Sequence, residues 1–327
     1  MTWLITGGAG YIGGHVVRQL AEAGERVVVL DDLSSGAPGR LPAGVPLVVG
    51  STLDRGVLDA AIREHGVTGV LHVAAKKQVG ESVAEPLLYY RENVEGLRTV
   101  LDAAVGGGVR RVLFSSSAAV YGMPDVDVVT EDTPCAPINP YGETKLVGEW
   151  LLQAAARAYG LSTVSLRYFN VAGAHSPELA DDGVSNLVPM VFRRLTDGLP
   201  PLVFGDDYPT PDGTCVRDYI HVEDVASAHV AAVRRLDAED GPLSLTLNIG
   251  RGEGVSVRGM LDAIARITGH GTAPENAPRR PGDPARVVAS ADLIRKELGW
   301  SARYGVDEMI GSAWEGWLAR HPGARRP

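Results

Sequence analysis

Short runs of apolar, β-branched residues recur through the first half of the chain and alternate with stretches of helical periodicity. The runs predict strands at 3–6, 26–32, 46–50, 69–75, 110–117 and 163–170. Between them, the spacing of apolar positions predicts helices at 12–24, 54–65, 86–105 and 140–159. Continuous hydrophobicity in a strand indicates that both of its faces are buried, and alternating strands and helices form right-handed crossovers. The pattern therefore predicts a doubly wound parallel α/β sheet.

The sequence pattern changes after residue 170, where Pro- and Gly-rich loops separate shorter predicted helices and strands. Here we predict helices near 186–197, 222–236, 256–268 and 290–298, and a strand at 245–250. We interpret residues 1–170 as the main domain and residues 171–327 as a smaller substrate-binding domain. A segment near 215–250 is expected to return to the main sheet.

The segment TGGAGYIGGH follows the first strand and carries Gly7, Gly10 and Gly13 where a helix begins. Free amides at a helix N-terminus bind a pyrophosphate, and glycines let the backbone approach it without a Cβ. A tight turn also favours glycine, but the position within a βαβ unit favours a dinucleotide site. Asp31 ends the second strand, where its carboxylate is either solvated or accepts both hydroxyls of an adenosine ribose. No Arg follows in DDLSSGA, so we expect NAD rather than NADP.

Composition and charge narrow the class of protein. The 327 residues include 45% apolar and 22% charged positions, with a formal net charge of −9, which is typical of a folded globular protein. The acidic balance argues against a nucleic-acid or anionic-membrane partner. Cys135 and Cys215 are too few for a disulfide framework or a metal knuckle, and the N-terminus lacks the pattern of a signal peptide. We therefore expect a cytoplasmic protein without a metal site.

A tyrosine and a lysine stand four residues apart at the start of the helix predicted at 140–159. In NPYGETKLVGEW, Asn139 is a favoured N-cap and Pro140 a favoured first helical residue. Residues i and i+4 share a helix face, and a positive charge beside a phenol lowers the pKa of that phenol. Tyr141 and Lys145 are therefore either a general base with its tuning cation or a surface pair on an amphipathic helix.

With the glycine loop, LFSSSAAVYG (113–122) and PYGETK (140–145) in one chain, the sequence resembles the extended short-chain dehydrogenase/reductase family. More narrowly, KKQVGESV, LRYFNVAGAH, GTCVRDYIHVEDVA and APRRPGD resemble the UDP-glucose (UDP-galactose) 4-epimerases. The resemblance covers essentially the whole chain. It implies an NAD-binding Rossmann domain, a C-terminal domain that binds a UDP-sugar, and a homodimer formed through the helices near 86–105 and 140–159.

The resemblance also implies a reaction and its catalytic residues. Tyr141 takes the proton of the sugar 4-OH while C4 gives its hydride to NAD, and the resulting 4-keto sugar turns over and is reduced on its other face. Lys145 keeps the phenol acidic and binds the nicotinamide ribose, and Ser117 hydrogen-bonds the reacting oxygen. Alternatively, Ser117 is a strand-end hydroxyl that satisfies a local amide.

The same resemblance assigns contacts to the cofactor. They are Gly7, Gly10, Tyr11, Ile12, Gly13, Asp31, Ser51, Lys77, Asn93, Tyr141 and Lys145. Ser51 stands where the family commonly has an Asp that binds adenine, and its hydroxyl can accept the same hydrogen bond. Lys77 and Asn93 are expected along the cofactor, although each by itself would be interpreted as a surface polar residue.

Contacts to the UDP-sugar follow from the resemblance as well. They are Ser117, Phe169, Asn170, Asn186, Leu187, Leu202, Phe204, Arg217, Arg280, Asp283 and Val287. Arg217 and Arg280 match diphosphate-binding arginines, whose guanidinium fork suits that group, and the segment 202–204 matches the one that lines uracil. Without the resemblance, Arg217 would be interpreted as an ion-pair partner of Asp218 or Asp224.

Val287, four residues past Asp283, matches the position that closes the pocket around the C2 substituent of the sugar. Epimerases with a Tyr there resemble UDP-glucose/galactose specialists, so a valine predicts that UDP-N-acetylglucosamine is epimerised as well. Alternatively, Val287 is a buried strand residue and another side chain closes the pocket.

Other functions are compatible with parts of the pattern. A nucleotide-sugar 4,6-dehydratase needs an acid and a base after the catalytic serine, and a uronic-acid decarboxylase usually has a Glu there, but this chain has Ala118 and Ala119. A UDP-uronic acid 4-epimerase is a further alternative. A non-catalytic NAD-binding protein is also an alternative, because a protein can keep its fold and lose its chemistry. The intact Ser117, Tyr141 and Lys145 argue against it.

Overall fold

In the part of the chain that the structure describes, seven parallel strands form the central sheet, in the order β10-β6-β5-β4-β1-β2-β3. The structure is a computed structural model that describes residues 1–183, 186–239, 241–280 and 282–324. Pro281 of the motif APRRPGD therefore lies outside the described residues. The strands are β1 (Thr2–Thr6), β2 (Arg26–Asp31), β3 (Leu47–Val49), β4 (Gly69–His72), β5 (Arg111–Ser117), β6 (Ser162–Tyr168) and β10 (Ser244–Ile249). The predicted parallel sheet is confirmed, and the strand predicted at 245–250 joins its edge beside β6.

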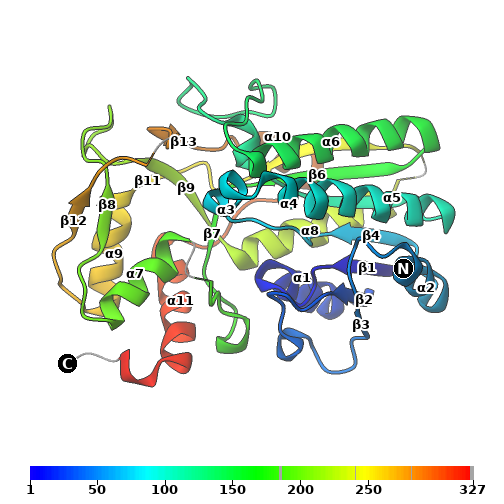
Figure 1. The fold of residues 1–327 in the computed structure, drawn as a ribbon, viewed down its shortest axis with the longest axis horizontal. Coiled ribbons are helices and arrows are strands. Elements are labelled where there is room, and N and C mark those ends of the chain that lie inside the picture. Colours follow the sequence, from blue (N-terminus) through cyan, green and yellow to red (C-terminus); the bar gives the residue numbers. More distant parts are fainter. Residues whose placement is uncertain (184–185, 240, 281, 325–327) are drawn as a thin grey trace.

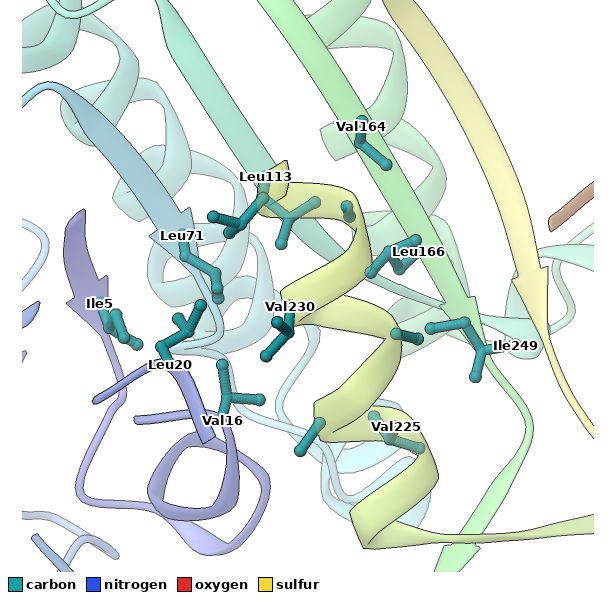
Figure 2. Packing of buried hydrophobic residues seen from close by; sticks show 14 of the residues in the cluster. Ile5, Val16, Leu20, Leu71, Leu113, Val164, Leu166, Val225, Val230 and Ile249 are labelled. Carbon is teal, nitrogen blue, oxygen red and sulfur yellow. The ribbon is translucent and has the colours of Figure 1, made fainter. Parts of the chain in front are cut away.

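Helices cover both faces of this sheet (Figure 1). The helices α1 (Tyr11–Glu22) and α8 (Val222–Asp237) pack on one face, and α2 (Arg55–His65), α5 (Gly96–Gly106) and α6 (Pro140–Tyr159) on the other. On the first face, Leu20 of α1 and Val230 of α8 join Leu166 of the sheet in one buried cluster (Figure 2). The inner strands β1 and β4 are buried along their whole length because helices cover both of their faces.

The strand order reverses at β1, and this places a crevice at the carboxyl ends of β1 and β4. The chain leaves β1 through α1 toward β2, whereas β4 pairs with the opposite edge of β1. The turns that follow the two strands approach closely, since a Cβ on Gly7 would lie 2.6 Å from the amide nitrogen of Ala74. In doubly wound sheets, ligands bind at such a reversal.

The helix predicted at 86–105 is confirmed, but a π-helical turn interrupts its regular α-helical hydrogen bonding. The structure has α3 (Val79–Ala84) and α4 (Pro86–Tyr89), then a π-helical turn, η2 (Tyr90–Glu95), before α5. The wider turn places Asn93 in the interior, where it is 4% exposed. Single π-helical turns recur at functional sites, because the extra residue redirects a side chain.

The remaining elements form a second lobe beside the strand ends (Figure 1). Within the described residues, β7 (Asn170–Ala172), β9 (Val216–His221), β11 (Gly254–Ser256) and β13 (Arg286–Val287) form one small sheet, and β8 (Leu202–Phe204) pairs with β12 (Glu275–Ala277). The helices of this lobe are α7 (Leu187–Thr196), α9 (Val257–Thr268) and α11 (Val306–Arg320). A further helix, α10 (Asp292–Leu298), instead packs against α8 and β10, and its Ile294 joins the cluster on the first face of the central sheet. Short 3-10 turns follow β2 and β5 of the central sheet, at Pro38–Arg40 and Ala118–Tyr121. Two more follow β7 and α11, at Pro177–Leu179 and Pro322–Ala324.

The second lobe has its own core, in which Phe192 of α7 packs against Trp314 and Trp317 of α11. Of the helices in the described ranges, none is long and apolar enough to cross a lipid bilayer.

Candidate functional site

A cleft of about 370 Å³ follows the carboxyl edge of the central sheet. Its walls come from Asp31 at the end of β2, Gly7 after β1, Val73 after β4, Ser115 in β5 and Tyr168 in β6. The five strands are neighbours in the sheet, so the cleft is elongated along that edge. This is the edge at which the sequence predicted a dinucleotide site.

The glycine loop at the floor of the cleft has no room for side chains on its inner side. Gly7 has a φ of +71°, and a Cβ on Gly13 would lie 2.1 Å from the carbonyl oxygen of Gly7. Gly10 is the N-cap of α1, and no described side chain caps that helix. The amides of the first helical turn therefore have neither intrahelical nor side-chain acceptors, so the loop fits an anionic diphosphate.

Asp31 both holds the glycine loop and lines the cleft. Its Oδ2 accepts from the amide of Ala9 and its Oδ1 from the amide of Leu33, each at 2.9 Å. Burial raises the pKa of Asp31, while the amides of Leu33 and Ala9 oppose that effect. Each carboxylate oxygen keeps a second lone pair, so the residue fits two ribose hydroxyls and disfavours a 2′-phosphate.

Tyr141 and Lys145 lie at the opposite end of the cleft. Lys145 is 4% exposed. Its Nζ lies 5.9 Å from the centroid of the Tyr141 ring and donates to the carbonyl oxygen of Ser115 at 2.8 Å. Burial lowers the pKa of Lys145 to about 7, against the opposing charge of Glu149. The pair is therefore part of an interior site and not a solvated helix face.

The expected lowering of the Tyr141 pKa by Lys145 is wrong for the protein alone. Burial raises the pKa of Tyr141, and its hydrogen bond with the Ser117 hydroxyl opposes that rise. Lys145 gives up part of its own charge near neutral pH because it is buried as well. Desolvation outweighs attraction when both partners leave water.

The Ser117 hydroxyl satisfies a local amide, as the second alternative for it predicted, and its contact with the reacting oxygen stays a prediction. Its Oγ accepts from the amide of Ala119 at 3.2 Å, which caps the turn that follows β5. Its hydroxyl also favours the phenolate of Tyr141. The two preceding serines have other hydrogen-bond partners. Ser116 donates to Glu149 at 2.5 Å, and Ser115 hydrogen-bonds the hydroxyl of Tyr168.

Asn93 has a different position from the one expected along a cofactor. Its Oδ1 accepts from the amide of Lys76 at 2.8 Å, and its Nδ2 donates to the Lys76 carbonyl and to Thr144 Oγ1, both at 3.0 Å. The side chain thus holds the loop after β4 against the residue that precedes Lys145. Lys77, on that loop, lines the cleft as expected.

Ser51 also differs from the expectation. Its Oγ accepts from the amide of Leu53 at 3.1 Å, and the cleft is lined instead by its neighbours Gly50 and Thr52. Tyr168 was not assigned a role from the sequence, although it precedes Phe169 within the quoted LRYFN segment and lines the cleft.

The second lobe brings several of the expected substrate contacts to one place. Arg217 in β9 donates from Nη2 to Asp283 Oδ1 at 3.0 Å, and not to the nearby Asp218 or Asp224. Val287 in β13 pairs with Arg217 in register. The alternative interpretation of Arg217 as an ion-pair partner is therefore confirmed, but its partner is Asp283 rather than Asp218 or Asp224.

The remaining expected contacts lie on three further elements. The guanidinium of Arg280 lies 3.8 Å from the centroid of the Phe204 ring on β8, the strand that begins at Leu202. Asn170 begins β7 and is exposed. Asn186 is the N-cap of α7, which begins at Leu187, and donates to Asp181 at 2.9 Å. Phe169 is buried in one cluster with Val287.

Known proteins with similar sequences and structures point to the same chemistry. The profile of the NAD dependent epimerase/dehydratase family matches residues 3–250. A UDP-glucose 4-epimerase of Azospirillum brasilense is 46% identical over 95% of this chain and 91% of its own, and one of Streptomyces lividans is 45% identical over 98% and 97%. The structure also resembles a crystal structure of UDP-glucose 4-epimerase from Stenotrophomonas maltophila with bound NAD and formylated UDP-arabinopyranose. That similarity has a TM-score of 0.93 at 42% identity and covers 98% and 99% of the two chains. The chain therefore belongs to the NAD dependent epimerase/dehydratase family.

Proposed function

We propose that this chain uses NAD to invert C4 of a UDP-hexose, interconverting UDP-galactose and UDP-glucose through a transient 4-keto sugar. One observation carries the proposal. A single cleft joins a diphosphate-binding glycine loop and Asp31 at one end to the half-buried Tyr141 and the buried Lys145 at the other. The similarity of the whole chain to UDP-glucose 4-epimerases supports the choice of substrate.

The residues that would hold NAD are distributed along the cleft. The amides of Tyr11 and Ile12 suit the diphosphate, Asp31 suits the adenosine ribose, and Lys77 and Lys145 lie toward the nicotinamide end. When bound, NAD supplies a hydride acceptor for C4 of the sugar and a donor for the return step. Every other step belongs to side chains of the protein.

In the proposed mechanism, Tyr141 removes the proton of the 4-OH and later returns it, and Ser117 donates a hydrogen bond to the same oxygen. Lys145 fixes the helix that carries Tyr141 relative to β5, because its Nζ donates to the carbonyl oxygen of Ser115. The keto sugar has to expose its other face before reduction, so it needs an anchor away from C4. Arg217 and Arg280 supply that anchor by binding the diphosphate.

Neighbouring activities of the family are less well supported. A dehydratase or decarboxylase needs a proton-transferring side chain after Ser117, and Ala118 and Ala119 form the turn at that place. A UDP-uronic acid 4-epimerase would use the same catalytic residues. It remains the alternative, and a panel of UDP-hexoses and UDP-uronic acids separates the two.

The two lobes divide the ligands between them in this proposal. Residues 1–170, completed by α8 and β10 from the segment near 215–250, form the NAD-binding domain. Residues 171–327 otherwise form the UDP-sugar-binding domain. The two unpaired thiols, Cys135 and Cys215, suit the reducing cytoplasm, where we place the enzyme.

The sugar range is proposed to include UDP-N-acetylglucosamine. Val287 is buried beside Phe169, where a small residue leaves space for a larger C2 substituent. Val287→Tyr should abolish turnover of the N-acetylated sugar and spare UDP-galactose. A wild-type enzyme that turns over UDP-galactose but no N-acetylhexosamine would show that Val287 is only a packing residue.

A homodimer is proposed through the helices expected at 86–105 and 140–159, which are α4, η2, α5 and α6 in the structure, with α3 packed beside α4 and α6. Val83, Leu87 and Trp150 are 64%, 83% and 58% exposed there. Large apolar side chains gathered on one face are typical of an interface. The wild-type chain should scatter light as a dimer at micromolar concentration and Leu87→Lys as a monomer, whereas Val49→Lys, exposed on β3, should stay dimeric. A monomeric wild type would end this proposal.

The function itself is tested with purified protein. Denaturation should release NAD, and the native protein should convert UDP-galactose to UDP-glucose without added cofactor. Released NAD without any conversion would favour a non-catalytic NAD-binding protein instead.

A further inference from the structure

Three consecutive residues after β7 are each held by a side chain from a distant helix. The carbonyl oxygen of Gly173 accepts from the hydroxyl of Tyr11 at 2.6 Å, and the amide of His175 donates to Nε2 of His15 at 3.0 Å. Between them, the amide of Ala174 donates to Ser312 Oγ of α11 at 3.1 Å. Two of the three contacts therefore come from the first turns of α1.

The protonation of His15 follows from its partners. Because the amide of His175 donates to Nε2, that nitrogen carries no hydrogen, so Nδ1 carries it and donates to the carbonyl oxygen of Tyr11 at 2.8 Å. Burial lowers the pKa of His15 to about 4, so the ring is neutral at physiological pH. Its ring also meets the Tyr11 ring edge-on at 5.4 Å. Tyr11 and His15 thus form one fixed unit on α1.

The segment 173–175 has little freedom to move away from this unit. Gly173 has a φ of +93°, and a Cβ there would lie 2.6 Å from Nε2 of His221. That same nitrogen hydrogen-bonds Ser312 Oγ at 2.9 Å. The backbone is therefore enclosed between α1 on one side and His221 with Ser312 on the other.

The contacts between α1 and residues 173–175 join elements that belong to the two proposed ligand sites. Tyr11 begins α1, whose free amides are proposed to bind the cofactor diphosphate, and β7 begins at Asn170, a proposed substrate contact. We propose that Tyr11 and His15 are positioning residues that couple the cofactor loop to the substrate strand β7. This inference rests on the proposed function, since it takes NAD and a UDP-sugar as the two ligands. In this proposal each ligand binds best when residues 173–175 keep the arrangement that Tyr11 and His15 hold, so binding at either site favours binding at the other.

The test uses Tyr11→Phe, which keeps the ring and removes the hydroxyl. The affinity for UDP is measured by calorimetry on NAD-loaded enzyme, and the affinity for NAD by equilibrium dialysis with and without UDP. Loss of one buried hydrogen bond predicts UDP binding that is about threefold to tenfold weaker. The factor by which UDP tightens NAD binding should fall by a similar amount. His15→Leu, which removes the second contact, should act in the same direction.

Ser312→Ala is the matched control, because it removes the contact with the same segment that does not come from α1. It should lower the unfolding temperature and leave the factor by which UDP tightens NAD binding unchanged. An unchanged factor in Tyr11→Phe, or an equal loss in Ser312→Ala, would overturn the inference and leave the proposed function standing. Wild-type enzyme that binds NAD but not UDP would instead overturn the proposed function together with the inference.

Discussion

Lys145 reaches from the first turns of α6 to the carbonyl oxygen of Ser115 on β5, at 2.8 Å. This hydrogen bond joins the helix that carries Tyr141 to the strand that ends at Ser117. The three proposed catalytic side chains are thereby fixed relative to one another by secondary structure, which locates a reacting group more firmly than a loop does.

Tyr141→Phe should retain NAD and UDP binding but lose most of its turnover. The ring still packs in the buried site, while the proton acceptor is gone. General acid–base groups contribute about 10²–10⁴-fold to rate. Initial rates with UDP-galactose measure the loss, and one below about tenfold would assign the base to another residue.

Lys145→Met should move the acidic limb of the rate profile to higher pH. Burial raises the pKa of Tyr141, and the Ser117 hydroxyl opposes that rise. The Lys145 ammonium lies 5.9 Å from the ring centroid and favours the phenolate when it is charged, so its removal should raise the pKa of Tyr141 further. Removal of an opposite charge raises a pKa by about one unit or more. An acidic limb of kcat/KM that does not move would contradict the tuning role.

Glu149→Gln should destabilise the fold strongly. Arg167 donates to Glu149 from Nε at 2.9 Å and from Nη2 at 2.7 Å, with both residues buried. Loss of one charge leaves the other uncompensated in the interior, at a cost of about 3–5 kcal/mol. Urea unfolding measures the change.

The control for that variant is Glu95→Gln, which removes a carboxylate from the exposed pair with Arg98. Exposed ion pairs contribute about 0–1 kcal/mol, so this variant should unfold close to the wild type. Equal losses in the two variants would contradict the dependence on burial.

Acid should destabilise the protein through its buried neutral histidines, of which His229 is one. Burial lowers the pKa of His229 from 6.5 to about 4. As pH falls, the histidine therefore takes up a proton in the unfolded chain before it does so in the folded protein. Its contribution to the free energy of unfolding is fully present above pH 6.5 and is lost as the pH falls toward 4. At pH 5 the loss is on the order of 2 kcal/mol for one such histidine. Urea midpoints at pH 7 and pH 5 measure it, and His229→Gln should reduce the difference between them.

The sequence predicted the central sheet well because its signals are local. Strands such as 3–6 and 26–32 are buried on both faces and therefore apolar throughout, and the 140–159 helix has an N-cap and a proline at its start. Apart from β9, the strands of the second lobe have two or three residues each, too few for any periodicity. Their order depends on contacts between distant segments, which no local pattern encodes.

The site was predictable in residue type but less so in detail. Motifs located Tyr141, Lys145 and Asp31 correctly at the cleft. They did not predict that Asn93 would face the Lys76 backbone, because this depends on a π-helical turn. They also gave the wrong direction for the pKa of Tyr141, because spacing carries no information about desolvation.

The most direct test of the account follows the hydrogen at C4. UDP-galactose with deuterium at C4 is incubated with the enzyme in ordinary water, and the product is examined by NMR. Because the hydride leaves C4 and returns to it while the sugar stays bound, we expect UDP-glucose that retains the deuterium at C4. Product in which the label has been replaced by solvent hydrogen, or the absence of any UDP-glucose, would contradict it.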